Sequence, residues 1–415
     1  MSSRRLVVLV AGLVVLACVA FIATWAMLAR AHHRGPAPSG LRLESRTLTS
    51  LQLNWDDTLG ATAYRVRYWS KDDGSDLRLA TFGRSAGTLK GLKQRTQYLI
   101  SVAVGDADGD GEKSLWSTSF KAWTAAPKAL LRVGSFNISD PHVDDEDKDG
   151  HDWGKRRKAI ADDILEESVD VVGIQEAYED ADRESLMKAV NADGGHYAMA
   201  LPADDFHGRD NRILYDTRRV ELRKIGYESY PDQVSDDYER VMVWAVLRPK
   251  ANGHDFLFVV THLTPENSKK VRLQGLHLID RVKELNTAYS PRLPVVIVGD
   301  LNTSKFQKRG SSIIEKMDDA GFGDVLGQQY GTYELDDPRA EEVIDGWVGS
   351  FNDYDRDMSS HVVSKDRIGH NIDWIFATNS LRVPRWRTVA HFDDGRLRGT
   401  IASDHFLVTA DLVLP

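Results

Sequence analysis

An apolar run that ends in polar residues constrains this chain most. The run Val295–Val298 is rich in β-branched residues, as is typical of a strand buried on both faces of a sheet. It stops at Gly299, and Asp300 and Asn302 follow at alternate positions. Side chains two residues apart on an extended chain point to the same side. We therefore expect a carboxylate that can hold a metal or accept a proton beside an uncharged hydrogen-bond donor. The structural alternative is a simple Asx turn.

The same pattern recurs throughout the second half of the chain. Apolar strand-like runs alternate there with helix-like runs, such as residues 155–167, and this alternation predicts a layered α/β domain. Because strand ends cluster at one edge of a sheet, the polar residues that follow the runs are expected to converge. The runs are 131–137, 169–176, 256–262, 295–302, 372–376 and 406–414. The polar residues at or beside their ends are Asn137, Glu176, His262, Asp300, Asn302, Asp373, Asp404 and His405.

A chain of 415 residues is too long for one ordinary core, so two or more domains are expected. Before residue 126, short alternating segments separated by turn residues predict an antiparallel β-sandwich. These segments are 41–44, 51–55, 64–68, 98–104 and 120–123. Trp55, Tyr64, Tyr68 and the spacing from Leu92 to Tyr98 resemble a fibronectin type III domain, in which the hydroxyl of Tyr98 would bond back to the backbone. We assign residues 36–126 to this domain and 130–415 to the α/β domain.

The expected sandwich is assigned no chemistry, because such domains are mostly spacers or adhesion modules, and this one is expected at most to contact surface polymers. Segments 106–111 and 145–150 both show the acidic alternation of a calcium loop. Their twelfth positions are Ser117 and Arg156, where a calcium loop needs a bidentate glutamate. Polar surface loops are therefore the preferred interpretation, with calcium binding as the alternative.

The N-terminus predicts a membrane anchor. Arg4 and Arg5 precede an uncharged apolar run over residues 6–28, which is long enough to cross a bilayer as a helix. A cleaved signal peptide usually has a shorter apolar core, so an uncleaved anchor with a linker, residues 1–35, is favoured. A very short N-terminal tail normally stays inside the cell. We expect a single-pass membrane protein with its catalytic part outside, or a secreted protein if the segment is cleaved.

Charge and cysteine content add weaker constraints. The net charge is -9, so the overall field does not draw the chain to polyanions, and nucleic-acid binding becomes less expected without being excluded. Cys18 is the one cysteine, so no intrachain disulfide can form.

The second half resembles the endonuclease/exonuclease/phosphatase superfamily. Six motifs follow that family's order and cover nearly all of residues 131–415: Ser135-Phe-Asn137, Ile174-Gln-Glu176, Thr261-His-Leu263, Gly299-Asp-Leu-Asn302, Ile372-Asp373 and Ser403-Asp-His405. The resemblance implies a four-layered α/β sandwich of two packed mixed β-sheets flanked by helices.

The resemblance also implies a divalent metal. Glu176 would bind the ion, Asn137 would support the site, and Asp404 resembles a further carboxylate on the metal side. Mg²⁺ is expected, with Mn²⁺ as an alternative, because Mg²⁺ keeps several waters and takes only one or two carboxylates.

The remaining motif residues are implied to act on water and phosphate. Asp300 and His405 would prepare the attacking water, and the sequence leaves open which of them takes the proton. Asp373 would hold His405 in one tautomer. Asn302 and His262 would donate to phosphate oxygens as charge develops. Arg209, Arg212 and the basic run 155–158 are further candidate phosphate contacts, although the basic run equally fits a solvated helix face.

Three functions follow, in order of preference. The first is a metal-dependent phosphodiesterase, most simply a surface-anchored or secreted nuclease. The second is a phosphatase or sphingomyelinase-like enzyme that acts on lipid or inositol phosphates, which a membrane anchor would suit. The third is an inactive adhesion protein, which the complete set of motif residues argues against. We expect a monomer, and we expect the long polar and aromatic stretch 327–370 to shape the substrate cleft.

Overall fold

The computed structural model describes residues 35–415 apart from residues 72, 106–112, 126–129, 142–151, 193, 203–208, 232–238, 266–267 and 328–337. The chain divides into two compact units, Met1–Pro127 and Lys128–Pro415. The predicted anchor over residues 6–28 and the acidic segments 106–111 and 145–150 lie outside the described residues. Within the described part, no helix combines the length and the apolar character that a membrane crossing requires.

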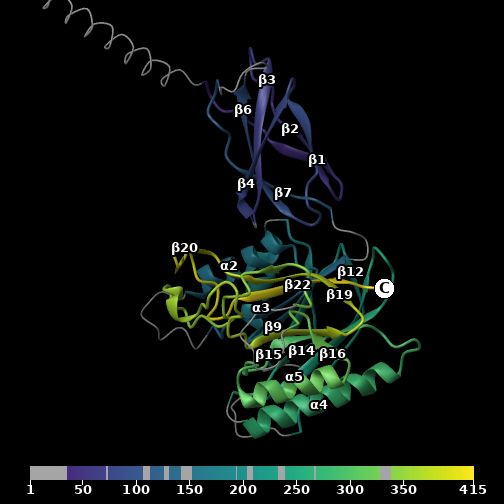
Figure 1. Cartoon of the computed structure of the whole chain (residues 1–415). Helices are drawn as coiled ribbons and strands as arrows, with labels where there is room; N and C mark the ends of the chain where they lie inside the picture. Colours follow the sequence, from purple (N-terminus) through teal and green to yellow (C-terminus); the bar gives the residue numbers. More distant parts are fainter. Residues whose placement is uncertain are drawn as a thin grey trace, which may run out of the picture. The chain divides into compact units, whose positions relative to one another are not determined.

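The first unit is a sandwich of two antiparallel sheets (Figure 1). One sheet has the order β1-β2-β5, formed by Arg42–Arg46, Ser50–Asn54 and Ala86–Lys90. The other has the order β4-β3-β6-β7, formed by Asp73–Phe82, Ala63–Ser70, Gln97–Gly105 and Phe120–Trp123. Alternate residues of β3 and β6 point inward, so Val66 and Ile100 are completely buried in the shared core. The predicted β-sandwich is confirmed, whereas β4 and β5 had no counterpart among the predicted strands.

The turn before β6 is closed by a tyrosine. The hydroxyl oxygen of Tyr98 accepts a hydrogen bond from the backbone N–H of Lys93 at 2.9 Å, and the Tyr98 ring is buried. This is the contact expected from the spacing of Leu92 and Tyr98. It joins the turn to the core of the sandwich.

Replacing Tyr98 by Phe removes that hydrogen bond and keeps the ring. We expect Tyr98→Phe to lower the free energy of unfolding of the first unit by about 1 kcal/mol. Urea unfolding of the full chain, followed through the transition of this unit, measures the change. Tyr68→Phe is the matched control, because Tyr68 lies in the same core and its hydroxyl makes no hydrogen bond to any residue that the structure describes. Equal losses in the two variants would contradict a role for the hydroxyl of Tyr98.

The second unit contains two mixed sheets. The seven-stranded sheet has the order β10-β11-β9-β8-β22-β19-β17, and the six-stranded sheet has the order β12-β13-β14-β15-β18-β16. In chain order the first sheet comprises Leu130–Asn137 (β8), Val171–Gln175 (β9), Tyr197–Ala200 (β10), Arg212–Asp216 (β11), Val343–Ile344 (β17), Arg382–Val389 (β19) and Leu407–Val413 (β22). The second comprises Val220–Ser229 (β12), Val241–Pro249 (β13), Phe256–His262 (β14), Val295–Asp300 (β15), Phe322–Asp324 (β16) and Asp373–Thr378 (β18).

The two sheets pack face to face, and helices cover their outer faces. Val133 and Val260, from different sheets, belong to one buried cluster between them. Helices α2 (Trp153–Glu167) and α3 (Asp180–Ala192) share a cluster with the outer side of the seven-stranded sheet, and α4 (Ser268–Thr287) and α5 (Lys308–Asp319) share one with the six-stranded sheet. This confirms the predicted sandwich of two mixed sheets flanked by helices. A short hairpin, Phe392–Asp393 (β20) with Arg396–Leu397 (β21), and a 3-10 turn, Met358–Ser360 (η2), complete the unit.

The strand registers explain how the polar motif residues meet. In the parallel pair β14 and β15, His262 stands opposite Asp300, and in the antiparallel pair β15 and β18, Asp300 stands opposite Asp373. In the other sheet, Asn137 at the end of β8 stands opposite Gln175, next to Glu176. Two parallel strands end at the same edge of a sheet, and an antiparallel neighbour begins at that edge. These residues therefore lie at one edge of the sandwich.

Gly173 on β9 allows the two sheets to approach closely. A Cβ at this position would lie 2.4 Å from a methyl carbon of Val298 and 2.8 Å from one of Val260. Both valines are completely buried in the core between the sheets, so neither has room to move. The absence of a side chain at Gly173 therefore sets the spacing of the sheets beside the motif residues.

Filling this position should separate the sheets locally. We expect Gly173→Ala to lower the free energy of unfolding of the second unit by about 1–3 kcal/mol, as overpacking in a core does. Gly275→Ala on α4 is the matched control, because its Cβ would meet Ile313 at an ordinary 3.4 Å and alanine favours a helix. Chemical denaturation of both variants tests the difference. A Gly173→Ala protein as stable as Gly275→Ala would contradict the close approach.

Candidate active site

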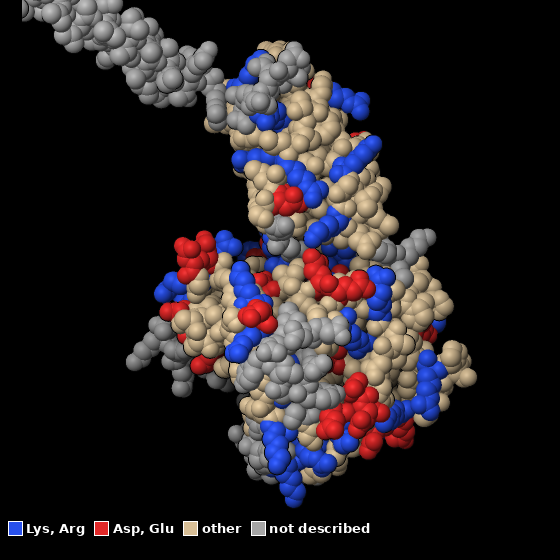
Figure 2. Space-filling model, in the orientation of Figure 1, with Lys and Arg blue, Asp and Glu red and all other residues tan. Residues whose placement is uncertain are grey.

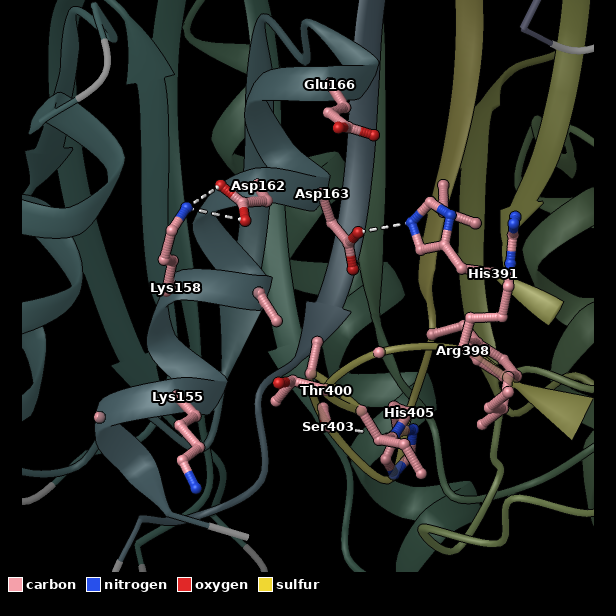
Figure 3. A pocket seen from close by; sticks show the side chains of 18 residues that line it. Lys155, Lys158, Asp162, Asp163, Glu166, His391, Arg398, Thr400, Ser403 and His405 are labelled. Carbon is pink, nitrogen blue, oxygen red and sulfur yellow. Dashed lines mark hydrogen bonds and ion pairs between the residues drawn. The ribbon is translucent and has the colours of Figure 1, made fainter.

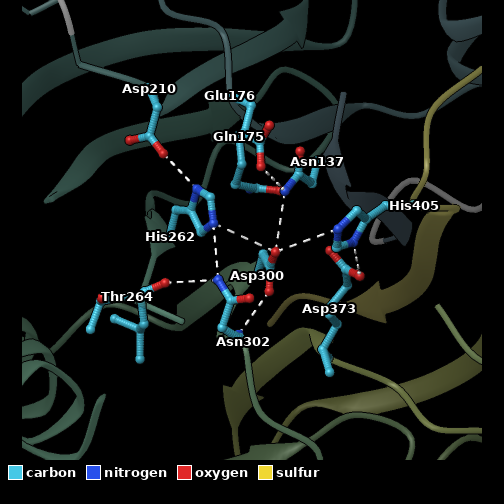
Figure 4. A network of polar contacts seen from close by, with 12 residues as sticks. Asn137, Gln175, Glu176, Asp210, His262, Thr264, Asp300, Asn302, Asp373 and His405 are labelled. Atoms are coloured by element: carbon cyan, nitrogen blue, oxygen red, sulfur yellow. Dashed lines mark hydrogen bonds and ion pairs between the residues drawn. The ribbon is translucent and has the colours of Figure 1, made fainter. Parts of the chain in front are cut away.

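Asp300 is the centre of the site (Figure 4). Its side chain is almost completely buried at the end of β15. One carboxylate oxygen accepts from the backbone N–H of Asn302 at 2.7 Å, and the other accepts from Nδ2 of Asn137 at 3.2 Å. The second oxygen also lies 3.6 Å from Nε2 of His262 and 3.7 Å from Nε2 of His405. A single carboxylate thus faces two imidazoles and an amide from neighbouring strand ends.

His405 and Asp373 form a buried pair on one side of this carboxylate. Nδ1 of His405 lies 2.8 Å from a carboxylate oxygen of Asp373, which leaves Nε2 directed toward Asp300. Burial lowers the pKa of His405, but the carboxylates of Asp373 and Asp300 outweigh it and hold that pKa well above its ordinary value. Burial raises the pKa of Asp373, and this effect is larger than the lowering caused by His405. The geometry is the one expected for a carboxylate that orients a catalytic histidine.

His262 has its own carboxylate on the other side. Its Nδ1 lies 2.6 Å from Asp210, and its Nε2 lies 3.1 Å from Nδ2 of Asn302. Burial raises the pKa of Asp210, but the hydrogen bond with His262 and the charges of His262, Arg240 and Arg212 together outweigh burial and lower that pKa. Asp210 was not among the predicted site residues. The only signal for it in the sequence is a polar pair, Asp210-Asn211, just before a strand.

Asn137 and Glu176 come from adjacent strand ends of the seven-stranded sheet. Nδ2 of Asn137 donates to Glu176 at 2.8 Å as well as to Asp300, and the second oxygen of Glu176 accepts from the backbone N–H of Asp140 at 2.8 Å. Glu176 and Asn302 both adopt left-handed backbone conformations, with φ of 64° and 50°. Such conformations cost about 1–3 kcal/mol for most residues and concentrate at functional sites.

The donor atoms at the site suit a hard divalent cation. Asp300, Asp373 and His405 offer ligand atoms that lie within 4.8 Å of one another, and all three are buried. Nδ2 of Asn137 donates to the carboxylates of both Glu176 and Asp300, so these two carboxylates lie close together. Carboxylate and amide oxygens are the ligands that Mg²⁺ and Mn²⁺ prefer. The residues therefore fit a divalent metal ion, whereas the role of Glu176 as its ligand stays a prediction.

Ser403 connects the strand that carries Asn137 to the segment that carries His405. Its hydroxyl donates to the backbone oxygen of Asn137 at 2.7 Å and accepts from the backbone N–H of His405 at 3.2 Å. It also lies 3.1 Å from a carboxylate oxygen of Asp404, whose charge contributes to the raised pKa of His405. Asp404 thus lies beside the site, whereas its predicted role as a metal ligand stays a prediction.

The long stretch after residue 337 contacts the site through residues that were not singled out in the sequence. The ring of Phe351 lies 5.0 Å from the ring of His405. The hydroxyl of Ser350 accepts from the backbone N–H of Asp373 at 3.1 Å, and the amide of Asn352 donates to the backbone oxygen of Ser403 at 3.0 Å. The stretch therefore contacts the site through Ser350, Phe351 and Asn352, whereas its predicted role in shaping a substrate cleft stays a prediction.

The candidate basic residues have different surroundings. Arg212 is completely buried on β11, where it donates to the backbone oxygen of Asn211 and burial lowers its pKa to about 9. Arg209 lies 2.8 Å from Glu239. Arg156 is buried and donates to the backbone oxygens of Ile138 and Ala402, so it joins the chain segments next to Asn137 and Ser403. Contact of Arg212 with substrate phosphate stays a prediction.

The comparisons with known proteins agree with this geometry. The model of the Endonuclease/Exonuclease/phosphatase family matches residues 134–405, which is more than half of the chain. The chain belongs to this family. The fibronectin type III model matches residues 36–120, so the family's catalytic domain follows a fibronectin type III domain here. No curated protein matches the chain significantly.

Solved structures show the same fold at low sequence identity. An endonuclease/exonuclease/phosphatase family protein from Bacteroides thetaiotaomicron is 20% identical over 69% of this chain and 95% of its own, with a TM-score of 0.55. A mannosyl-6-phosphatase of the same organism is 20% identical over 68% of this chain and 100% of its own, with a TM-score of 0.54. A Bacteroides vulgatus family protein reaches 21% identity over 69% and 99%, with a TM-score of 0.53. At this identity the likeness concerns the fold.

The pair of Asp210 and His262 generates a prediction for this family member. Asp210→Asn retains the size of the side chain but removes the charge that orients the imidazole. We expect turnover to fall roughly 10- to 100-fold, as it does when the hydrogen-bond partner of a functional histidine is lost. Steady-state hydrolysis of bis-para-nitrophenyl phosphate measures the change. Asp216→Asn, at the opposite end of β11, is the control and should retain its turnover. Full turnover in Asp210→Asn would show that His262 does not depend on Asp210.

Proposed function

We propose that this protein is a metal-dependent phosphoesterase that hydrolyses a phosphate ester by in-line attack of an activated water. One observation carries the proposal: a buried Asp300 carboxylate is surrounded by Asn137, His262 and His405, and each of these side chains comes from a different strand end. A core or a turn does not require this cluster of polar groups, and burying it is costly unless each group is paired.

The residues divide into those that handle water and those that hold phosphate. Asp300 takes the proton from the attacking water, because His405, whose pKa is raised, serves better as a donor to a phosphate oxygen. Asp373 holds the His405 ring in place. On the other side, His262 and Asn302 donate to phosphate oxygens as negative charge develops, with His262 oriented by Asp210.

A divalent cation would be held by Glu176 with the support of Asn137 and, as proposed from the sequence, Asp404. Mg²⁺ is the proposed ion and Mn²⁺ the alternative, because the donors are oxygens. When bound, the ion neutralises the phosphate and stabilises the leaving oxygen.

Nucleic acid is the substrate class that the sequence favours, and lipid or inositol phosphates are the second class. Both present a phosphate ester, so the geometry around Asp300 serves either one. We also propose a surface location through residues 6–28, with the catalytic unit outside the cell, or secretion if that segment is cleaved. The fibronectin type III domain would then act as a spacer or contact surface polymers, in a monomeric protein.

The test uses the full chain in mild detergent with Mg²⁺, with Mn²⁺ and with chelator. Plasmid DNA, RNA, sphingomyelin, phosphoinositides and bis-para-nitrophenyl phosphate are offered in parallel. We expect metal-dependent release from at least one ester, and a loss of roughly 100- to 10,000-fold in Asp300→Asn and His405→Ala.

Asp280→Asn is the matched control, because Asp280 is exposed on α4. Hydrolysis of no ester by the folded wild-type protein with either metal would reject the proposal and favour an inactive adhesion protein. Hydrolysis that survives Asp300→Asn would place the chemistry elsewhere.

A further inference from the structure

The glutamine of the motif Ile174-Gln-Glu176 lies at the catalytic group and has no role in the chemistry described so far. Gln175 is the last residue of β9, where it stands opposite Asn137 at the end of β8. Its side chain is completely buried. A buried glutamine needs partners for both halves of its amide, because leaving a donor or an acceptor unpaired is costly.

The two halves of this amide have different surroundings. Oε1 of Gln175 accepts a hydrogen bond from the hydroxyl of Ser135 at 3.5 Å. Nε2 of Gln175 is enclosed by the protein, yet it has no hydrogen-bond partner among the residues that the structure describes. Because Ser135 holds the oxygen, the N–H groups of Nε2 point away from Ser135. An unpaired buried donor in a native structure needs a reason, and a part in binding or catalysis is one such reason.

The alternation of β9 shows where the side chain points. Gly173, two residues before Gln175, packs against β14 and β15 of the opposite sheet, so Gln175 faces the same sheet. His262 and Asp300 are the last residues of β14 and β15, and Asn137 beside Gln175 already reaches Asp300. The amide of Gln175 therefore lies among the groups that meet around Asp300, as Figure 4 shows.

The other two amides of this group are already engaged. Nδ2 of Asn137 donates to two carboxylates, which uses both of its hydrogens. Nδ2 of Asn302 donates to a backbone oxygen at 2.9 Å and lies 3.1 Å from Nε2 of His262. Gln175 differs from both, because its hydrogens can meet an incoming oxygen without breaking a contact to any described residue.

A phosphate oxygen is an acceptor that this donor fits. Nε2 can only donate, so it requires an acceptor. On the face that Figure 2 shows, basic and acidic side chains are interspersed, and the net charge of the chain is -9, so the overall field adds little attraction for a phosphate. Donors inside the site therefore matter more. An amide has no net charge, so it can lie close to the carboxylates of Asp300 and Glu176 without forming an ion pair with either.

We propose that Gln175 is a further catalytic residue, whose Nε2 donates a hydrogen bond to an oxygen of the reacting phosphate as negative charge develops on that oxygen. The proposal rests on the proposed phosphoesterase function and adds a donor to those of His262 and Asn302. Because Nε2 is unpaired in the free protein, this hydrogen bond is gained only when the substrate is present. Donors of this kind stabilise a transition state without giving up a contact beforehand.

The test removes the donor and keeps the length of the side chain. In the full chain with Mg²⁺ or Mn²⁺, Gln175→Met should lower kcat on bis-para-nitrophenyl phosphate roughly 100-fold and leave KM within about twofold. Orthovanadate, which adopts the geometry of a phosphoryl transition state, should bind the variant at least about tenfold more weakly in a calorimetric titration. The urea midpoint of the second unit should not fall, because methionine leaves no donor unpaired.

Three further variants serve as comparisons. Gln175→Glu keeps the shape but replaces the donor by a carboxylate, so it should lose at least as much turnover as Gln175→Met. Gln97→Met alters another buried strand glutamine, on β6 of the first unit, and should leave kcat unchanged. Asp162→Asn changes a partly exposed charge on α2 (Figure 3) and should likewise alter neither kcat nor vanadate binding. Wild-type turnover in Gln175→Glu would show that the shape of residue 175 matters and its donor does not.

The outcomes separate the two proposals. If the wild-type protein hydrolyses an ester but Gln175→Met retains its kcat, or loses kcat together with its urea midpoint, the proposal for Gln175 is overturned while the phosphoesterase function stands. If the wild-type protein hydrolyses no ester, the phosphoesterase function fails and vanadate binding decides about Gln175. Equal binding by the wild type and Gln175→Met then overturns the contact with the anion, and weaker binding by the variant supports it.

Discussion

The buried carboxylate of Asp300 is the constraint on which the catalytic unit depends. A charge removed from water is costly unless donors surround it, and the chain supplies donors from both sheets. Asn137 comes from the seven-stranded sheet, and the backbone N–H of Asn302 comes from the exit of the six-stranded sheet. The donors can converge only if the two sheets pack closely at this edge, which the bare backbone of Gly173 permits.

Each imidazole beside Asp300 is held by a further carboxylate. Asp373 binds Nδ1 of His405, and Asp210 binds Nδ1 of His262. Both rings therefore direct Nε2 toward the same carboxylate oxygen of Asp300. This arrangement fixes the orientation of two rings that would otherwise rotate. A site held in this way is preorganised, and under the proposed phosphoesterase function its residues would need little rearrangement as charge develops on a phosphate.

Much of the fold and of the catalytic cluster could be predicted from the sequence. Buried strands are readable as β-branched runs, and polar residues at the ends of parallel neighbours must meet, as His262 and Asp300 do. The strands β4 and β5 of the fibronectin type III domain could not be read, because β4 places Leu77 and Leu79 on its exposed face and each strand contains a glycine. Asp210 was missed for a different reason. It precedes strand β11, and no sequence motif distinguishes it from other polar residues.

The sequence by itself determined the family, the order of the strands that carry the polar motif residues, and most of the side chains that meet around Asp300, because these depend on local periodicity and on short motifs. The tertiary structure alone decided which carboxylate serves each histidine and how Ser350, Phe351 and Asn352 reach the segment of Asp373 and His405. Those features join segments that are far apart in the chain. Local patterns do not encode such distances, because the packing of two sheets and four helices sets them.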